Sequence, residues 1–310
     1  MSERVEEICS IELPTGESVG VHRRRFTGGP GPHVAVVAGV RGDTPEGTRV
    51  AHAVGAHLRA NHERLSGTVD VYPCVNPLAA HHGARSWPAF DLDLNRRFPG
   101  RSDGHAPDRV AYALIEAVRG AEQVIELRGA HPAFREETQA HVRADQAVAL
   151  ERAMRANVRV VWRKSAEIQG VGTLATEIPG LVSLEGGVGN RLTDGVGLEL
   201  CDGVLNLLVV LGVLPEDGLP FHWAAIQRPI VATDDDVVRV RATRGGLFLP
   251  YGRMWAEVNV GDPLGEVVDP IVGDTREIVT APVAGRVLAL REQPVVYPGS
   301  LVARIVAAAE

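Results

Sequence analysis

An unbroken apolar run, residues 34–40, predicts the central strand of the chain. A run without charge is typical of a strand buried on both faces, as in parallel sheets. It stops at a polar turn, residues 41–44, after which Pro45 and Glu46 suit the first turn of a helix. Because ligands bind beyond the carboxyl ends of strands in open α/β sheets, a site is expected at this turn.

Buried strands and amphipathic helices alternate over the first two thirds of the sequence. Helices are predicted at residues 46–61, 107–118 and 145–157, and from an N-cap at Asp194 to about Leu211. Strands are predicted at residues 68–75, 124–127, 158–162 and 181–185, with an edge strand or a hairpin before residue 25. This alternation favours a parallel or mixed sheet covered by helices on both faces.

Beyond His222 the helical period disappears. Short β-branched segments, separated by Gly, Pro and Asp turns, follow at residues 237–240, 256–260, 277–280, 285–290 and 301–306. We therefore expect an α/β domain over residues 1–220 and a small all-β domain over residues 221–310.

Composition narrows the class of protein. With 310 residues, of which 45% are hydrophobic and 23% charged, the chain can bury a large core without disulfides. The net charge of -7 comes from well-mixed signs, which argues against nucleic acid as a partner. No run is long enough to span a membrane, which takes ~20 apolar residues. Three widely spaced cysteines and an N-terminus without an apolar segment favour a cytoplasmic protein.

Residues 78–104 are predicted to form a long loop, and loops of this length are usually functional when they carry many large side chains. Three motifs occur in order in and just before it: Asn76-Pro77-Leu78-Ala79, Gly83-Ala84-Arg85, and Asp93-Leu94-Asn95-Arg96-Arg97-Phe98-Pro99-Gly100. With the turn after residue 40, these motifs resemble the succinylglutamate desuccinylase/aspartoacylase family of the zinc carboxypeptidase-like superfamily. The resemblance implies a carboxypeptidase-like mixed sheet with helices on both faces, followed by a barrel-sandwich-like β domain.

The resemblance also implies roles for particular residues. Asn95 and Arg96 would bind the substrate carboxylate, Arg85 would polarise the scissile carbonyl, and Glu185 would be the general acid and base. A guanidinium offers a planar two-donor fork to a carboxylate, which suits the first of these roles. The alternatives stay open that Arg96 and Arg97 merely solvate a loop and that Glu185 is an exposed strand-end charge.

The positions that hold zinc in that family carry other residues here, namely Arg41, Thr44 and Arg128. Arginine stays protonated and has no lone pair to give, so it is not a zinc ligand. No cofactor is therefore expected, and Arg41 and Arg128 are instead predicted to bind an anion. Relocated ligands could come only from a set without ligand spacing: Asp43, Glu46, His81, His82, Glu126 and His131.

These observations predict a diverged, zinc-free homologue that binds a small carboxylate-bearing or polyanionic ligand, such as an N-acyl amino acid. Glu185 would assist any reaction, which would take place at a C–N amide bond without metal. Two alternatives stay open: a pseudoenzyme whose Arg41 pairs with Glu185 or Glu126, and a zinc-dependent amidohydrolase with relocated ligands. Whether the chain is an enzyme, and whether it forms a homo-oligomer, is left open.

Overall fold

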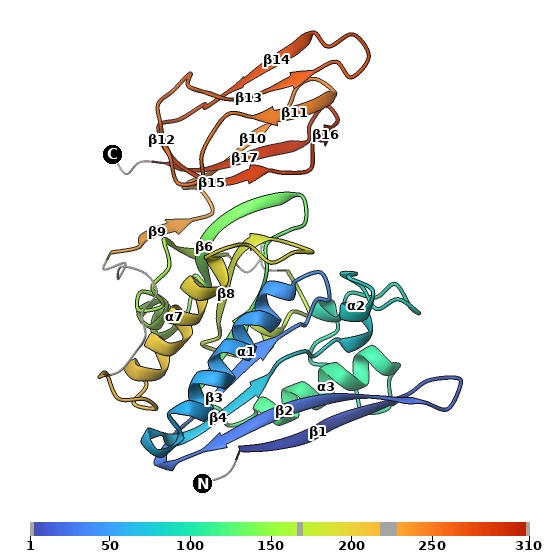
Figure 1. Ribbon diagram of the computed structural model, residues 1–310, viewed down its shortest axis with the longest axis vertical. Helices are drawn as coiled ribbons and strands as arrows, with labels where there is room; N and C mark the ends of the chain where they lie inside the picture. The colour runs from blue at the N-terminus through green and yellow to red at the C-terminus, as the bar shows by residue number, and fades with distance from the viewer. Residues whose placement is uncertain (1–2, 166–169, 218–227, 308–310) are drawn as a thin grey trace.

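The computed structural model describes residues 3–165, 170–217 and 228–307. A large mixed sheet runs through the molecule, with α1 and α7 on one face and a small β-rich part stacked above it (Figure 1). The predicted fold class, a mixed α/β sheet with a smaller C-terminal β region, is confirmed. The predicted boundary at residues 220–221 lies outside the described residues.

The elements of the α/β part alternate much as the pattern predicts. Its strands are β1 (Glu3–Glu12), β2 (Ser18–Thr27), β3 (Gly29–Ala38), β4 (Ser66–Tyr72), β5 (Gln123–Leu127), β6 (Phe134–Arg143), β7 (Val160–Lys164) and β8 (Val182–Val188). Its helices are α1 (Pro45–Ala60), α2 (Pro77–His81), α3 (Ala106–Val118), α4 (Ala147–Ala153), α6 (Leu174–Glu177) and α7 (Val196–Val210), with short 3-10 turns η1 (His62–Arg64) and η2 (Leu94–Arg96).

The C-terminal part is built of strands only, within the residues described. These are β9 (Ile230–Thr233), β10 (Val237–Arg241), β11 (Gly246–Pro250), β12 (Glu257–Val258), β13 (Pro263–Val268), β14 (Thr275–Thr280), β15 (Gly285–Arg291), β16 (Val295–Val296) and β17 (Leu301–Ala307). Strands β14, β13, β11 and β16 form a separate antiparallel sheet. Strand β15 pairs with β6, so the large sheet continues from the α/β part into this one.

Strand β3 is the centre of the first part. It pairs in parallel with β4 on one side and with β5 on the other, and β5 pairs in parallel with β8. Its side chains alternate between two cores: Val34 and Val36 pack with α1 and α7, whereas Val37 packs with α3. The apolar run predicted both of these contacts, because a strand covered on both faces has no polar side.

Three local predictions were wrong. Residues 78–104 are not a structureless loop, because most of α2 and all of η2 lie within them. Asp194 does not cap α7, since the N-cap is Gly195 at φ +83° without a side-chain cap bond. Glu185 lies inside β8 and not at its end, because the strand continues through Gly186 and Gly187 to Val188.

Strand β6 escaped prediction altogether. Its sequence carries five charged or amide side chains in ten residues and has no apolar run. The strand is nevertheless buried, because β8 and β7 pair with it along most of its length and β15 pairs with its first residues. Its polar side chains Glu136, Gln139 and His141 are buried.

Asp70 is a buried acidic residue on β4, the strand that lies between β2 and β3. Its side chain is fully buried and accepts two 2.7 Å bonds from Arg25, while His33 Nε2 lies 2.9 Å away. Despite the opposing effect of burial, the bonds from Arg25 and His33 lower the pKa of Asp70 to about 2. A carboxylate with a depressed pKa stabilises the fold above its unfolded pKa of ~3.9 and loses that contribution as the pH falls toward 2.

Asp70→Asn is expected to lower the free energy of unfolding by about 2–3 kcal/mol at pH 7, because it leaves buried cations without their counter-charge. The difference from wild type should shrink between pH 4 and pH 2, as measured by urea denaturation. Asp103→Asn, which breaks an exposed pair with Arg101, is the matched control and should leave stability unchanged. Equal stability of Asp70→Asn and wild type would contradict this account.

Candidate functional site

A polar pocket of about 250 Å³ lies beyond the carboxyl ends of β3 and β5. It is lined from both parts of the molecule, by Arg41, Arg85, Asn95, Arg96, Arg128, Gly129, His131, Glu136, His141, Trp162, Lys164, Thr173, Glu185, Arg239 and Arg304. All six residues predicted for the site are in this set. The chain segments that bring them together are up to 144 residues apart, which parallel strand ends make possible.

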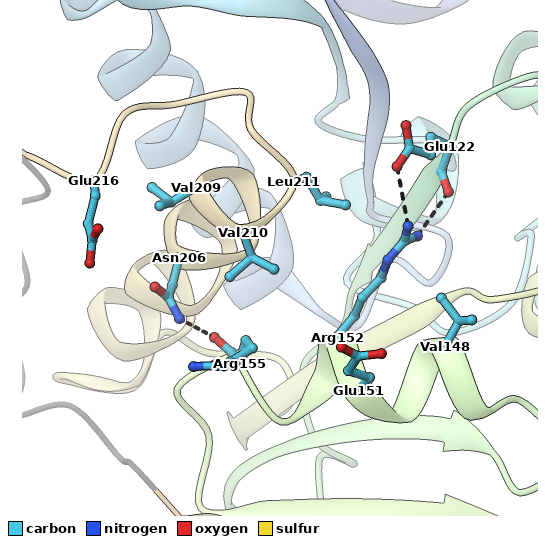
Figure 2. A pocket seen from close by; sticks show the side chains of 10 residues that line it. All are labelled: Glu122, Val148, Glu151, Arg152, Arg155, Asn206, Val209, Val210, Leu211 and Glu216. Carbon is cyan, nitrogen blue, oxygen red and sulfur yellow. Dashed lines mark hydrogen bonds and ion pairs between the residues drawn. The ribbon is translucent and has the colours of Figure 1, made fainter.

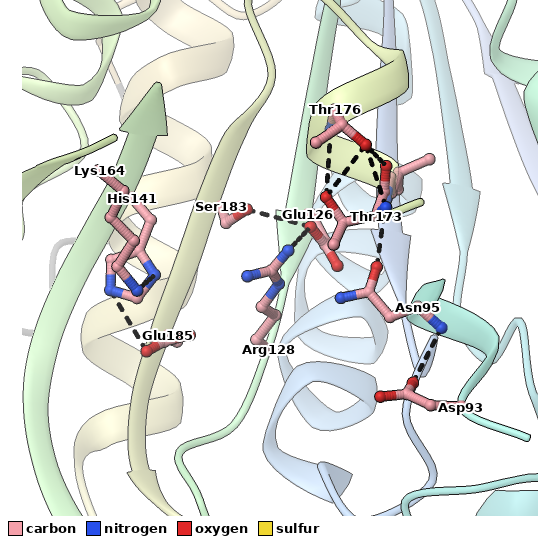
Figure 3. Close-up of polar contacts among 11 residues, drawn as sticks. Asp93, Asn95, Glu126, Arg128, His141, Lys164, Thr173, Thr176, Ser183 and Glu185 are labelled. Atoms are coloured by element: carbon pink, nitrogen blue, oxygen red, sulfur yellow. Dashed lines mark hydrogen bonds and ion pairs between the residues drawn. The ribbon is translucent and has the colours of Figure 1, made fainter. Parts of the chain in front are cut away.

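Arg41 and Arg128 reach the pocket as members of short-range ion pairs. Arg41 donates to both carboxylate oxygens of Asp43, at 3.1 and 2.8 Å, two residues along the same turn. Arg128 Nη2 donates to Glu126 Oε2 at 2.5 Å, and Ser183 Oγ donates to the same oxygen at 3.0 Å (Figure 3). The alternative in which Arg41 pairs with Glu185 or Glu126 is not what the structure shows, because Arg41 pairs with Asp43.

Asn95 and Arg96 sit on η2, which the Asp93 side chain caps by accepting from the Asn95 backbone N–H at 2.9 Å. The side-chain oxygen Oδ1 of Asn95 accepts from the Leu174 N–H at 3.1 Å, so the side-chain nitrogen Nδ2 points toward the Glu126–Arg128 pair (Figure 3). Arg85 is tied to the same motif, because its Nη2 lies 2.7 Å from Asp93 Oδ2.

Arg96 and its neighbour Arg97 take different directions. Arg96 lines the pocket, and its guanidinium passes Gly170 so closely that an added Cβ there would lie 2.5 Å from it. Gly170 also has φ +77°, a conformation that glycine adopts without strain. Arg97 instead donates to Asp108 at 2.7 Å, at the base of α3 and away from the pocket lining.

Glu185 is the end member of a row of three contacting side chains, which the sequence did not predict. Lys164 Nζ donates to His141 Nδ1 at 2.9 Å, and His141 Nε2 lies 3.3 Å from Glu185 Oε1 (Figure 3). Since Nδ1 accepts, the neutral ring carries its proton on Nε2, facing the carboxylate. The row joins three strands, β7, β6 and β8.

Burial shifts the acid–base balance of all three groups toward their neutral forms. It raises the pKa of Glu185, an effect that Lys164 partly offsets. It lowers the pKa of His141 well below the usual value, with further lowering by Lys164 and Arg128. It also lowers the pKa of Lys164 to about 8.

The sequence held one signal for Lys164 that pattern reading passed over: it is the only lysine, since the other 31 of the 32 basic residues are arginine. Arg239 and Arg304 were also missed, because they lie on β10 and β17 of the C-terminal part. Arg304 Nη1 donates to Glu136 Oε1 at 3.0 Å. No sequence pattern links these strands to the first domain.

The residues that the resemblance places at zinc-ligand positions do not have the chemistry of zinc ligands. Arg41 and Arg128 hold protons on every nitrogen, and the Thr44 hydroxyl donates to the Arg41 carbonyl at 2.8 Å. Thr44 is buried and packs against Gly129, outside the pocket lining. Among the described residues, no group of three or more His, Cys, Asp or Glu side chains could hold a metal ion.

A larger hollow, of about 610 Å³, lies at the opposite end of the sheet, between α4 and the end of α7 (Figure 2). Its wall carries Arg152, which donates to the Glu122 carbonyl at 3.0 Å, and apolar Val148 and Val210. It lies at the amino end of β5, away from the chemistry-bearing side chains. We therefore take the arginine-rich pocket as the candidate site.

Residues 30–149 match the family model for the succinylglutamate desuccinylase/aspartoacylase catalytic domain. This match covers less than half of the chain, and over these residues the chain is similar to that catalytic domain. N-alpha-acetyl-L-2,4-diaminobutyric acid deacetylase of Halomonas elongata is 35% identical over 83 residues, which are 27% of this chain and 24% of that relative. The match thus spans about a quarter of the curated relative.

Solved structures of low sequence identity share the fold over nearly the whole chain. The product-bound ectoine utilization protein EutE (DoeB) from Ruegeria pomeroyi has a TM-score of 0.81 and 22% identity, covering 96% of this chain and 93% of that one. A succinylglutamate desuccinylase from Silicibacter sp. TM1040 has a TM-score of 0.83 and 20% identity, covering 99% and 95%. No helix within the described residues is long and apolar enough to cross a membrane.

Glu126→Gln is expected to lower the free energy of unfolding by about 3 kcal/mol, because it leaves the Arg128 guanidinium without its counter-charge. The loss would add to an existing cost, because Arg128 Nε is already buried without a hydrogen-bond partner. Ser183→Ala removes only the second donor to Glu126 and should cost about 1.5 kcal/mol. Urea denaturation measures both, and a smaller loss in Glu126→Gln than in Ser183→Ala would refute the ranking.

Proposed function

We propose that this protein is a metal-independent member of the succinylglutamate desuccinylase/aspartoacylase family and binds a small carboxylate-bearing ligand, such as an N-acyl amino acid, in the arginine-rich pocket. The observation that carries the proposal is the charge of the lining. Seven side chains are cationic, namely six arginines and Lys164, whereas only Glu136 and Glu185 are acidic. A lining with more cationic than acidic side chains favours a ligand with negative charge.

The substrate class follows from two further points. Asn95 and Arg96 offer amide and guanidinium donors from one rigid turn, an arrangement that suits a planar carboxylate. The H. elongata relative is, by its name, a deacetylase of an N-acetylated amino acid. An N-acyl amino acid combines a carboxylate with a neutral carbonyl, which Arg85 could polarise while Glu185 gives or takes a proton.

Metal-independence rests on the donor set. With Arg41, Thr44 and Arg128 at the ligand positions, a bound water keeps its pKa near ~15.7, where catalytic zinc would lower it to about 7. Amide hydrolysis by zinc-bound hydroxide is then lost, and any reaction needs a nucleophile that the protein or the ligand supplies. Zinc with relocated ligands is disfavoured because Asp43 and Glu126 are already held by arginines.

A second candidate, a non-catalytic homologue, is favoured by one observation: Arg41, Arg85, Arg128 and Arg304 each pair with an internal carboxylate. The pocket could then be stable without a ligand. The two candidates differ in whether an added anion raises the melting temperature.

N-acetyl amino acids and dicarboxylates are expected to raise the melting temperature of the wild-type protein in a thermal-shift screen. Arg96→Ala should raise the dissociation constant about 10- to 100-fold, because losing a charge-assisted hydrogen bond costs about 1.5–3 kcal/mol. Arg97→Ala is the matched control, since Arg97 pairs with Asp108 outside the pocket, and its ligand-induced shift should equal that of wild type. No shift with any anion would favour the non-catalytic candidate.

Elemental analysis of the purified protein should find zinc far below one atom per chain. The combined variant Arg41→His, Thr44→Glu, Arg128→His restores the residue types that hold zinc in the family and should gain about one zinc. Stoichiometric zinc in the wild-type protein would instead establish relocated ligands.

A further inference from the structure

Lys164 is the only side-chain amine of the chain, and it lines the candidate pocket. Every other basic side chain in the sequence is one of 31 arginines, so where only a positive charge is needed this sequence uses a guanidinium. What an amine can do and a guanidinium cannot is lose its proton and become a nucleophile. The position of the single lysine therefore points to chemistry at its nitrogen.

The surroundings of Lys164 favour loss of that proton. Burial is the largest effect and lowers its pKa to about 8, helped by Arg128 and Arg304 and opposed by Glu185 and Glu136. Two neutral neighbours act in the opposite direction and favour the ammonium: His141 Nδ1 accepts its hydrogen bond, and the Trp162 ring centroid lies 4.4 Å from Nζ. Lys164 is a half-buried residue and lines the pocket.

The Lys164–His141–Glu185 row provides a path for the proton. The ammonium of Lys164 can pass a proton to His141 Nδ1 at 2.9 Å. His141 Nε2 lies 3.3 Å from Glu185 Oε1 but makes no hydrogen bond to it, so the ring has to turn toward the carboxylate before it releases its Nε2 proton there. A buried ion pair is thereby converted into a neutral amine and a protonated carboxyl, without any proton entering from solvent. A nucleophile and a general acid arise together in one pocket.

We propose that Lys164 is a nucleophile that forms a reversible imine with the carbonyl carbon of a small oxo-carboxylate held by the pocket arginines. This inference rests on the proposed anion-binding function, because the arginines orient the carbonyl. It requires no metal and no oxidant, and it uses an amine that becomes a nucleophile when it loses its proton.

The step balances in atoms and charge. The lone pair of the Lys164 nitrogen attacks the carbonyl carbon, forming a C–N bond, and a nitrogen proton moves to the oxygen to give a carbinolamine. Glu185 then protonates the hydroxyl, the C–O bond breaks, and one water leaves. The iminium carries the positive charge that the ammonium carried, and Glu185 is again a carboxylate.

Reductive trapping tests the proposal. The full chain is incubated with glyoxylate and sodium cyanoborohydride, and tryptic peptides are analysed by mass spectrometry. Only two amines can react, Lys164 and the N-terminal amine. Labelling of Lys164 blocks cleavage after it, so a carboxymethylated peptide 164–191 replaces peptide 165–191. Glycolaldehyde, which has the same aldehyde without the carboxylate, is the matched probe.

Glyoxylate is expected to label Lys164 at least about tenfold faster than glycolaldehyde does, since one charge-assisted bond to the carboxylate contributes at least about 1.4 kcal/mol. Arg96→Ala should lower the rate with glyoxylate about tenfold or more, and Arg97→Ala should leave it unchanged. Lys164→Arg, which keeps the charge, should show no label in that region.

The outcomes separate this inference from the proposed function. A thermal shift with glyoxylate but no label at Lys164 from either aldehyde overturns the nucleophile and leaves anion binding standing. Equal labelling by both aldehydes, without a thermal shift, overturns the oxo-carboxylate ligand and the proposed anion pocket together. Labelling of the N-terminal amine alone also overturns the role of Lys164.

Discussion

A guanidinium keeps its proton, so every arginine that reaches the pocket needs a carboxylate or an anion beside it. The chain meets this constraint locally at two strand ends, where Arg41 pairs with Asp43 and Arg128 with Glu126, each two residues apart. Both pairs are therefore local in sequence and need no partner from another strand. Lys164 differs from these arginines. Its carboxylate, Glu185, lies on another strand, and His141 lies between the two side chains.

The fold was predictable as far as apolar patterning reached. Burial on both faces explains the apolar run of β3, and burial on one face explains the amphipathic pattern of α1 and α3. The loss of the helical period after residue 222 likewise predicted the β-rich C-terminal part. Strand β6 could not be predicted this way, because its buried side chains are Glu136, Gln139 and His141. Glu136 and His141 line the site and Gln139 donates to Glu136, so the pattern failed where the chemistry lies.

The same distinction applies to the site. Asn95 and Arg96 could be singled out because they lie in one short motif on a capped turn, whereas His141, Arg239 and Arg304 come from strands that meet only in the folded chain. Composition held the remaining signal. A single lysine among 31 arginines is conspicuous in the sequence, but only the structure connects it to Glu185.

A zinc ion and a set of arginines differ in one property that matters for catalysis. Both stabilise negative charge, but only the metal also generates a nucleophile from water at neutral pH. If guanidinium groups supply the charge, the nucleophile has to come from elsewhere. In our proposal that group is the Lys164 amine, whose pKa is lowered by burial to about 8. If arginines do replace zinc ligands at the ends of β3 and β5, the single lysine on β7 is the side chain that could supply the missing nucleophile.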